Sequence, residues 1–260
     1  MFTKDNVIFE NDILITTMSH AAKYTKHEII DTVCKYANQI AKELGVTIVS
    51  SILIDDIVLR PKILGEMDMA YQSIKLSYVS ASNLMGDTNT CEFKQALSTL
   101  YHEFYHALDC EKIFLPKVYP EYVVSKSKDI LFAHKMWTEF FATYSTFDII
   151  ENLNLYKNFK CVFDENKDIT LKTYYTSRLM GYQIKSQHNI LCDNLVSQYL
   201  DKRSTKQLSD LYQMLIQRYP NINIEDLYQI HRLTNKCILK TVDFSTLKPI
   251  SIKELINRQK

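Results

Sequence analysis

Two histidines one helical turn apart are the residues of this sequence that most directly indicate chemistry. His102 and His106 enclose Glu103 in the run His-Glu-Phe-Tyr-His. On an α-helix the two histidines lie about 40° apart around the axis and one turn apart along it, so both imidazoles can bind one ion. Glu103 lies about 60° beyond His106, on the flank of the same face. The spacing therefore predicts a metal site with a carboxylate beside it that is not a ligand.

The chemistry that such a site supports is hydrolysis. A Zn²⁺ ion with two histidine ligands and an open position lowers the pKa of the water that it binds. The neighbouring Glu103 can accept the proton of that water and deliver it to a leaving amine. Composition alone predicts roughly 0.01 occurrences of this pattern in a chain with seven histidines. The opposite side of the expected helix is apolar, which places both histidines on a polar face.

A third ligand is expected from the next helix. Glu139 stands in the run Met-Trp-Thr-Glu-Phe-Phe-Ala-Thr, and a charged residue among aromatic side chains is rarely without a partner. The same helix face continues through Ala142, Thr143 and Thr146, which are small enough to allow a close approach of the two helices. These features favour Glu139 as the third ligand.

Two other residues are alternatives for this role. Asp109 follows His106 by three residues, but one straight helix spreads His102 to Asp109 over about 10 Å. We therefore expect Asp109 to orient His106 as a hydrogen-bond acceptor, or to be an ordinary residue at the helix end. His134, five residues before Glu139, is a weaker candidate ligand because that offset turns it away from the Glu139 face.

Several elements are expected to position these residues. Hydrophobic periodicity predicts a helix over residues 19–44, which Gly45 ends, and β-branched residues predict a strand over residues 46–54. Residues 70–78 alternate between apolar and polar, which is typical of a half-buried strand and possible at a sheet edge. The apolar side chains of that strand are Ile74, Leu76 and Tyr78.

The His-Glu helix should begin at an N-cap formed by Asn89 with Glu92 and end near Asp109. Pro116 and Pro120 predict a loop, and a second long helix is expected over about residues 128–152. We expect residues 153–168 to be irregular and residues 169–260 to form three or four helices, with breaks near 203–204 and 220–221. The predicted fold class is α+β: a domain of residues 1–152 followed by a helical region of residues 153–260 packed on it.

Taken together, the His-Glu-Phe-Tyr-His run and Glu139 resemble the gluzincin branch of the zincin metallopeptidases. The layout of helix, strands and His-Glu helix is similar to the compact ImmA/IrrE-type metallopeptidase domain over about residues 20–150. The resemblance implies a small domain made of an N-terminal helix, a short twisted sheet, the His-Glu helix and a third-ligand helix. It also implies that His102, His106 and Glu139 bind Zn²⁺ and that Glu103 is the general base.

The resemblance further implies that a peptide substrate lies along the 70–78 strand as an added strand, next to Ile74, Leu76 and Tyr78. Two features depart from the family. The bulky Phe104 and Tyr105 stand where the family has a small residue, and the residue that stabilises the oxyanion is not assigned. The candidates for that role are Tyr144, Tyr174, Tyr175, His188 and His231.

Composition excludes several other functions. The net charge is +1 and no basic run occurs, which argues against nucleic-acid binding and membrane-surface binding. No apolar run approaches ~18 residues, and the N-terminus is charged where a signal peptide would be apolar. The six cysteines form no Cys-x-x-Cys pair and are expected to be free thiols in a cytoplasmic protein. We expect a zinc metallopeptidase that acts on protein or peptide substrates; the alternative is a catalytically degenerate, zincin-like metal-binding protein that acts as an interaction or regulatory module.

Overall fold

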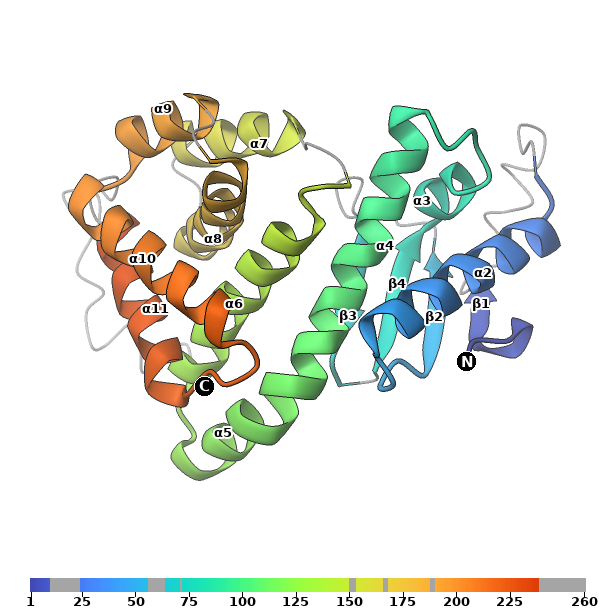
Figure 1. The fold of residues 1–260 in the computed structure, drawn as a ribbon, viewed down its shortest axis with the longest axis horizontal. Coiled ribbons are helices and arrows are strands. Elements are labelled where there is room, and N and C mark those ends of the chain that lie inside the picture. Colours follow the sequence, from blue (N-terminus) through green and yellow to red (C-terminus); the bar gives the residue numbers. More distant parts are fainter. Residues whose placement is uncertain are drawn as a thin grey trace, which may run out of the picture.

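The computed structural model describes residues 1–9, 24–55, 64–70, 72–149, 153–165, 168–187 and 190–238. Within these residues the fold is α+β, with a small mixed sheet and many helices (Figure 1). The strands are β1 (Val7–Phe9), β2 (Ser51–Asp55), β3 (Gly65–Asp68) and β4 (Ser73–Ser77). The helices as far as residue 146 are a 3₁₀ turn η1 (Lys4–Asn6), α2 (Lys26–Leu44), α3 (Tyr78–Asn83), α4 (Cys91–Asp109), a π-helix η2 (Cys110–Val118), α5 (Tyr119–Ser125) and α6 (Lys128–Thr146). They are followed by α7 (Leu153–Asp164), α8 (Ile169–Ser186), α9 (Ile190–Tyr199), α10 (Lys202–Arg218) and α11 (Ile224–Ile238).

The sheet has the strand order β1-β2-β4-β3. The pairs β1–β2 and β2–β4 are parallel, and β3 is antiparallel to β4. The predicted 70–78 strand is therefore present as β4, but its expected place at the sheet edge is wrong. Ile74 and Leu76 are fully buried between two neighbouring strands, and Tyr78 already belongs to α3. The edge strand on this side of the sheet is β3.

Helices α2 and α4 cover one face of the sheet (Figure 1). Thr25 accepts the Glu28 amide hydrogen bond and Glu28 accepts that of Thr25, so a capping box begins α2. Gly45 ends the helix with φ 68°, a left-handed conformation that favours glycine, as the sequence predicts. The first apolar cluster is formed where these helices meet β2 and β4, and it includes Val33, Ala37, Ile52, Ile74, Leu100 and Phe104.

A second apolar cluster lies among α6 and the helices that follow it. The Phe140 ring of α6 stacks on the Tyr212 ring of α10 with 3.8 Å between the ring centroids. The predicted boundary at residue 152 does not coincide with the division between the two clusters, because α6 packs with the C-terminal helices. The two clusters meet where α4 packs against α6.

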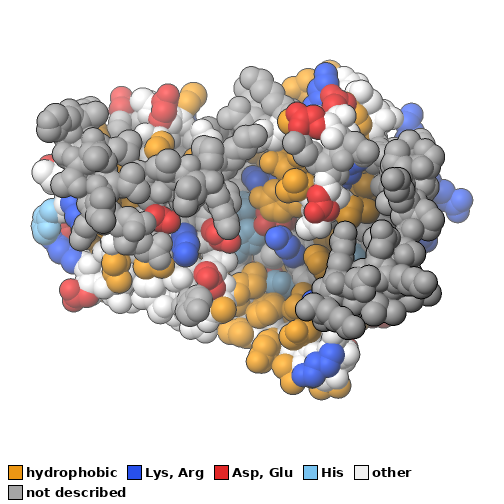
Figure 2. All heavy atoms as spheres, turned by 180° about the vertical axis from the view of Figure 1, so that it is seen from behind, with side chains coloured by type: hydrophobic (Ala, Val, Ile, Leu, Met, Phe, Trp, Pro, Cys, Tyr) orange, Lys and Arg blue, Asp and Glu red, His pale blue; other side chains and the backbone are white. Residues whose placement is uncertain are grey.

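Two connecting segments differ from the prediction. Pro116 lies inside η2 and Pro120 lies in the first turn of α5, where a proline is tolerated, so no loop separates α4 from α5. Residues 153–164 form α7 instead of an irregular segment. Figure 2 shows hydrophobic side chains gathered near the lower end of the molecule. The exposed hydrophobic residues of η2 and α5 are Leu115, Tyr119, Val123 and Val124. None of the helices in the described ranges is long and apolar enough to span a bilayer.

Candidate metal centre

Helix α4 supplies the first group of predicted site residues. The hydroxyl of Thr90 accepts the Phe93 amide hydrogen bond, so Thr90 caps the helix and not the predicted Asn89. The apolar face of α4 is buried against the sheet, with Phe104 fully buried. This packing leaves the polar face toward α6. The side chains on that face include those of His102, Glu103 and His106.

Three of the predicted ligands come together between α4 and α6. The His102 and His106 Nε2 atoms are 3.0 Å apart. Glu139 Oε2 lies 3.6 Å from His102 Nε2, and Glu139 Oε1 lies 3.7 Å from His106 Nε2. All three ligand atoms lie within 4.8 Å of one another. Two imidazole nitrogens and a carboxylate oxygen could thus hold one metal ion, and we call His102, His106 and Glu139 the metal cluster.

The environment of Glu139 fits a bound cation. Its side chain is 11% exposed, and Oε2 is a buried oxygen with no hydrogen-bond partner in the described part of the chain. A buried carboxylate oxygen without a donor is costly, because it loses its hydration and gains nothing in return. A cation between Glu139 and the two imidazoles would supply the missing interaction. The donor set of two nitrogens and one carboxylate oxygen is one that zinc and similar ions accept.

The second ring nitrogen of His106 is held by α6. His106 Nδ1 lies 2.8 Å from the Thr138 hydroxyl, and both residues are buried. A hydrogen bond at one ring nitrogen fixes the direction in which the other points. Thr138 therefore directs His106 Nε2 toward Glu139. Threonine is a common residue type in helices, so Thr138 gave no sign of this role in the sequence.

Asp109 does not take the predicted role of orienting His106. Its carboxylate lies 2.6 Å from His134 Nε2 and accepts a 2.8 Å hydrogen bond from the Trp137 indole. All three side chains are almost completely buried. The physical reason is the geometry of α4, which carries Asp109 one turn beyond the ligands and opposite an earlier turn of α6. The same contact keeps His134 out of the metal cluster, so the alternative ligand is not supported either.

Burial lowers the pKa of both candidate histidine ligands. The pKa of His102 is well below its usual range, first because of burial and then because of the Arg178 charge. Burial also lowers the pKa of His106 to about 3, although the Glu139 carboxylate opposes this shift. Both imidazoles are therefore neutral near pH 7. Neutral imidazole is the form that binds metal ions.

Glu103 lies beside the cluster, against the edge strand. A Cβ atom at Gly65 of β3 would lie 2.8 Å from Thr99 Cγ2 and 3.1 Å from Glu103 Oε1, so only glycine allows β3 to pass this close. Burial raises the pKa of Glu103 well above its usual range, and the Glu139 carboxylate adds to this. Arg178 and a hydrogen bond from the Met67 amide act in the opposite direction.

Helix α8 contributes a cation that the sequence did not single out. Arg178 donates a 2.9 Å hydrogen bond to the Tyr174 hydroxyl one turn earlier in the helix. Burial disfavours the guanidinium charge, but Tyr174 and Glu139 raise the pKa of Arg178 overall. Burial raises the pKa of Tyr174, which keeps its hydroxyl protonated at neutral pH. The spacing of Tyr174, Arg178 and Gly181 on one helix face was the available sign.

The other predicted positions are placed as follows. Phe104 packs edge-on against Phe2 in the first cluster, and Tyr105 packs edge-on against Phe141, so both bulky residues have packing partners. Among the oxyanion candidates, Tyr174 has a pKa that burial raises and that the charges of Glu139 and Glu103 raise further. The Tyr144 ring is contacted by Lys185, Tyr175 packs on Tyr174, and His231 belongs to α11. His188 lies outside the described residues.

Comparison with known proteins found no matching family model, no matching curated protein and no matching solved structure.

Proposed function

We propose that this chain is a zinc-dependent peptidase in which His102, His106 and Glu139 hold the ion and Glu103 is the general base. The observation that supports this most directly is the convergence of two imidazoles from α4 and a carboxylate from α6 on one point. Glu103 is not a member of the ligand group, and the Glu139 charge raises the pKa of its carboxyl. A ligand set of this kind with a free carboxylate beside it is typical of hydrolytic zinc sites.

When bound, a zinc ion would supply Lewis acidity for the hydrolysis of an amide bond. Glu103 accepts the proton of the attacking water and passes it to the leaving amine. The raised pKa of Glu103 suits the role of a general base, because it makes the carboxylate a better proton acceptor. The Met67 amide and the close approach of Gly65 keep the Glu103 carboxylate beside the cluster.

The sheet edge next to Glu103 favours an extended peptide as substrate. β3 pairs with β4 on one side and with no described strand on the other. An extended peptide could add to this free edge through backbone hydrogen bonds. Since Gly65 of β3 packs against Glu103, such a peptide would run beside the metal cluster. This proposal moves the substrate-binding strand from the predicted residues 70–78 to β3.

Metal analysis and one conservative variant test the proposed function. The purified chain should contain about one zinc ion per molecule, which His102→Ala and His106→Ala should lose. Glu103→Gln should retain the zinc but no longer hydrolyse peptides, because the amide cannot accept the proton. Mass spectrometry of a peptide library incubated with each protein measures the hydrolysis. Peptide cleavage by Glu103→Gln at the wild-type rate would contradict the role of Glu103. A wild-type chain that binds no zinc would contradict the whole proposal.

One observation favours the alternative of a non-catalytic metal-binding module. The three ligand side chains are only 7–13% exposed, which is a restricted access for a substrate. Under this alternative the ion stabilises the contact between α4 and α6 and the chain acts through its surface. The Glu103→Gln variant separates the two functions. If the zinc-loaded wild type and Glu103→Gln show the same lack of peptide hydrolysis, the result would support the module.

A further inference from the structure

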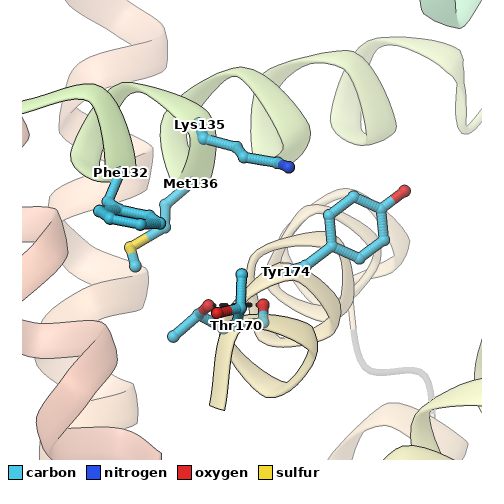
Figure 3. A pocket seen from close by; sticks show the side chains of 6 residues that line it. Phe132, Lys135, Met136, Thr170 and Tyr174 are labelled. Carbon is cyan, nitrogen blue, oxygen red and sulfur yellow. Dashed lines mark hydrogen bonds between the residues drawn. The ribbon is translucent and has the colours of Figure 1, made fainter. Parts of the chain in front are cut away.

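Helix α8 lies along α6 in a way that brings Arg178 level with Glu139. The two helices run in the same direction, so that early residues of α8 contact early residues of α6 and later residues contact later ones. A pocket near the start of both helices is lined by Phe132, Lys135 and Met136 of α6 and by Thr170, Thr173 and Tyr174 of α8 (Figure 3). Further along, a Cβ at Gly181 would lie 2.9 Å from the Phe140 carbonyl oxygen. Along α8, Arg178 lies between the pocket residues and Gly181. Along α6, Glu139 lies between the pocket residues and Phe140.

The Tyr174 hydroxyl is directed away from this pocket. In Figure 3 the Tyr174 hydroxyl lies on the far side of its ring from Phe132, Met136 and Thr170. That hydroxyl accepts the hydrogen bond from Arg178 Nη1. The contacts before and after Arg178 put it on the turn of α8 that faces the Glu139 turn of α6. In agreement with this position, the Arg178 charge lowers the pKa values of His102, Glu103 and His106.

Arg178 has unused binding capacity. Its Nε atom is buried and has no hydrogen-bond partner among the described residues. In the same described part of the chain, no carboxylate lies within ion-pair distance of its guanidinium. Buried cations are usually paired, because an unpaired buried charge loses its hydration without compensation. The Glu103 and Glu139 carboxylates interact electrostatically with Arg178 and provide some compensation.

A bound divalent cation would remove that compensation. The two carboxylates of Glu103 and Glu139 would then balance the charge of the ion. The guanidinium of Arg178 would be left without a counter-charge in a site of low exposure, where electrostatic interactions are strong. The loaded site as a whole would therefore attract an anion, and the positive end of the site is Arg178.

We propose that Arg178 and Tyr174 form an anion-binding site beside the His102–His106–Glu139 cluster that takes a carboxylate group of the ligand. The inference rests on the proposed function, since the charge balance requires a bound ion, and it names the substrate class. The substrate is a peptide that carries a free carboxylate close to the bond that is cleaved. A guanidinium offers a planar pair of donors that matches a carboxylate. The protonated Tyr174 hydroxyl can donate a further hydrogen bond.

Binding of small probes to the zinc-loaded full chain tests this site without any activity measurement. N-acetylglycine presents a terminal carboxylate, and N-acetylglycinamide is the same molecule with a neutral amide in its place. N-acetylaspartate α-amide presents the carboxylate on a side chain instead. Isothermal titration should give tighter binding for at least one of the two carboxylates than for the neutral amide. Whichever carboxylate binds more tightly identifies its position in the substrate, and either result supports the site.

Three variants connect this binding to the named residues. Arg178→Gln should weaken carboxylate binding about tenfold or more, because it removes a charge-assisted hydrogen bond. Tyr174→Phe should weaken it by roughly twofold to tenfold. Lys185→Gln is the matched control. It removes a cation of the same helix that pairs with Asp148 instead, and it should leave carboxylate binding unchanged. Arg178→Gln should keep its zinc, because it removes a positive charge and no ligand.

The possible failures can be told apart. Equal affinity for the acids and the amide, or equal carboxylate affinity in wild type and Arg178→Gln, would overturn the anion site while the metal site stands. A wild type that binds no zinc would overturn the proposed function and this inference together. If Arg178→Gln does not fold, as judged by circular dichroism and zinc content, Arg178→Lys and Tyr174→Phe provide the same comparison. Wild-type carboxylate affinity in both of these variants would also overturn the proposal.

Discussion

At the scale of single residues, His106 is held at both nitrogens of its ring. Its Nε2 lies between His102 and Glu139, and its Nδ1 contacts the Thr138 hydroxyl. The ring is therefore already oriented before any ion is present. Fixed ligand orientation contributes to metal affinity, because little conformational freedom is lost on binding.

Thr138→Val should lower metal affinity. Valine has nearly the shape of threonine but cannot hydrogen-bond to His106 Nδ1, so we expect zinc affinity to fall about tenfold or more. Competition with a chromophoric chelator measures the change. Thr146→Val is the control, because the Thr146 hydroxyl bonds to the Ala142 carbonyl of its own helix. Equal zinc affinities for the wild type and Thr138→Val would contradict the orienting role of Thr138.

The three residues that converge between α4 and α6 could be predicted from sequence, but the residues around them could not. His102 and His106 follow from helical spacing, and Glu139 follows from the cost of a charge among aromatic side chains. Thr138 has no comparable pattern, and the helical spacing of Arg178 with Tyr174 and Gly181 does not indicate what they face. The surroundings of Thr138 and Arg178 exist only once α4, α6 and α8 are packed together. Asp109 was placed wrongly for the same reason: its partners lie on α6 and not on its own helix.

At the scale of elements, the contact between α6 and α8 sets the position of Arg178. Gly181 allows this contact, because a side chain there would meet the Phe140 carbonyl oxygen at 2.9 Å and the Tyr144 amide at 3.1 Å. Both atoms belong to the backbone of a buried helix and cannot move aside easily. The position of α8 along α6 therefore depends on the absence of a side chain at residue 181.

Gly181→Ala should destabilise the protein, although alanine is the better helix former. Helix propensity alone favours alanine by about 1 kcal/mol, whereas overpacking typically costs about 1–3 kcal/mol. We therefore expect a lower free energy of unfolding in urea. Asn194→Ala, at an exposed position of α9, gains helix propensity without a steric clash and should be neutral or stabilising. A more stable Gly181→Ala variant would show that the two helices have room to separate.

The long elements of the fold could be predicted better than their neighbours. Residues 26–44, 91–109 and 128–146 are helical within the predicted ranges, because their apolar residues recur at helical spacing and helix-ending or capping residues flank them. The second long helix ends at Thr146 and not near residue 152, and the predicted start of the first helix, residues 19–23, lies outside the described residues. Proline misled the prediction at residues 116 and 120, since a helix tolerates proline at its start and where its hydrogen bonding changes. The edge position of a strand is not local information: alternation within β4 says nothing about how many neighbours it has.

At the scale of the whole molecule, the metal cluster joins two apolar clusters. His102 and His106 come from α4, which packs on the sheet, and Glu139 comes from α6, which packs with the C-terminal helices. An ion at this point would bind both halves of the described structure at once. Its binding should therefore stabilise the contact between the halves as well as the site itself.

Removal of the metal should lower the temperature of thermal unfolding. At a free zinc concentration of about 100 times Kd, binding adds about 2.7 kcal/mol, which corresponds to a shift of about 5–10 °C for a chain of this size. Calorimetry with zinc and with EDTA measures the shift. His102→Ala should abolish it, and His27→Ala, which changes an exposed histidine of α2, should retain it. A zinc-dependent shift that persists in His102→Ala would place the stabilising ion elsewhere.

The polar contacts between α4 and α6 follow one another in opposite directions along the two helices. His106 meets residues 138 and 139, and Asp109 meets residues 134 and 137. Sliding one helix by a single turn, about 5.4 Å, would break all of these contacts together. In the protein without an ion, the candidate ligand side chains are thus expected to be held in fixed positions. Uptake of an ion would then be limited by the loss of its hydration shell and by its passage inward, and not by any refolding of the chain.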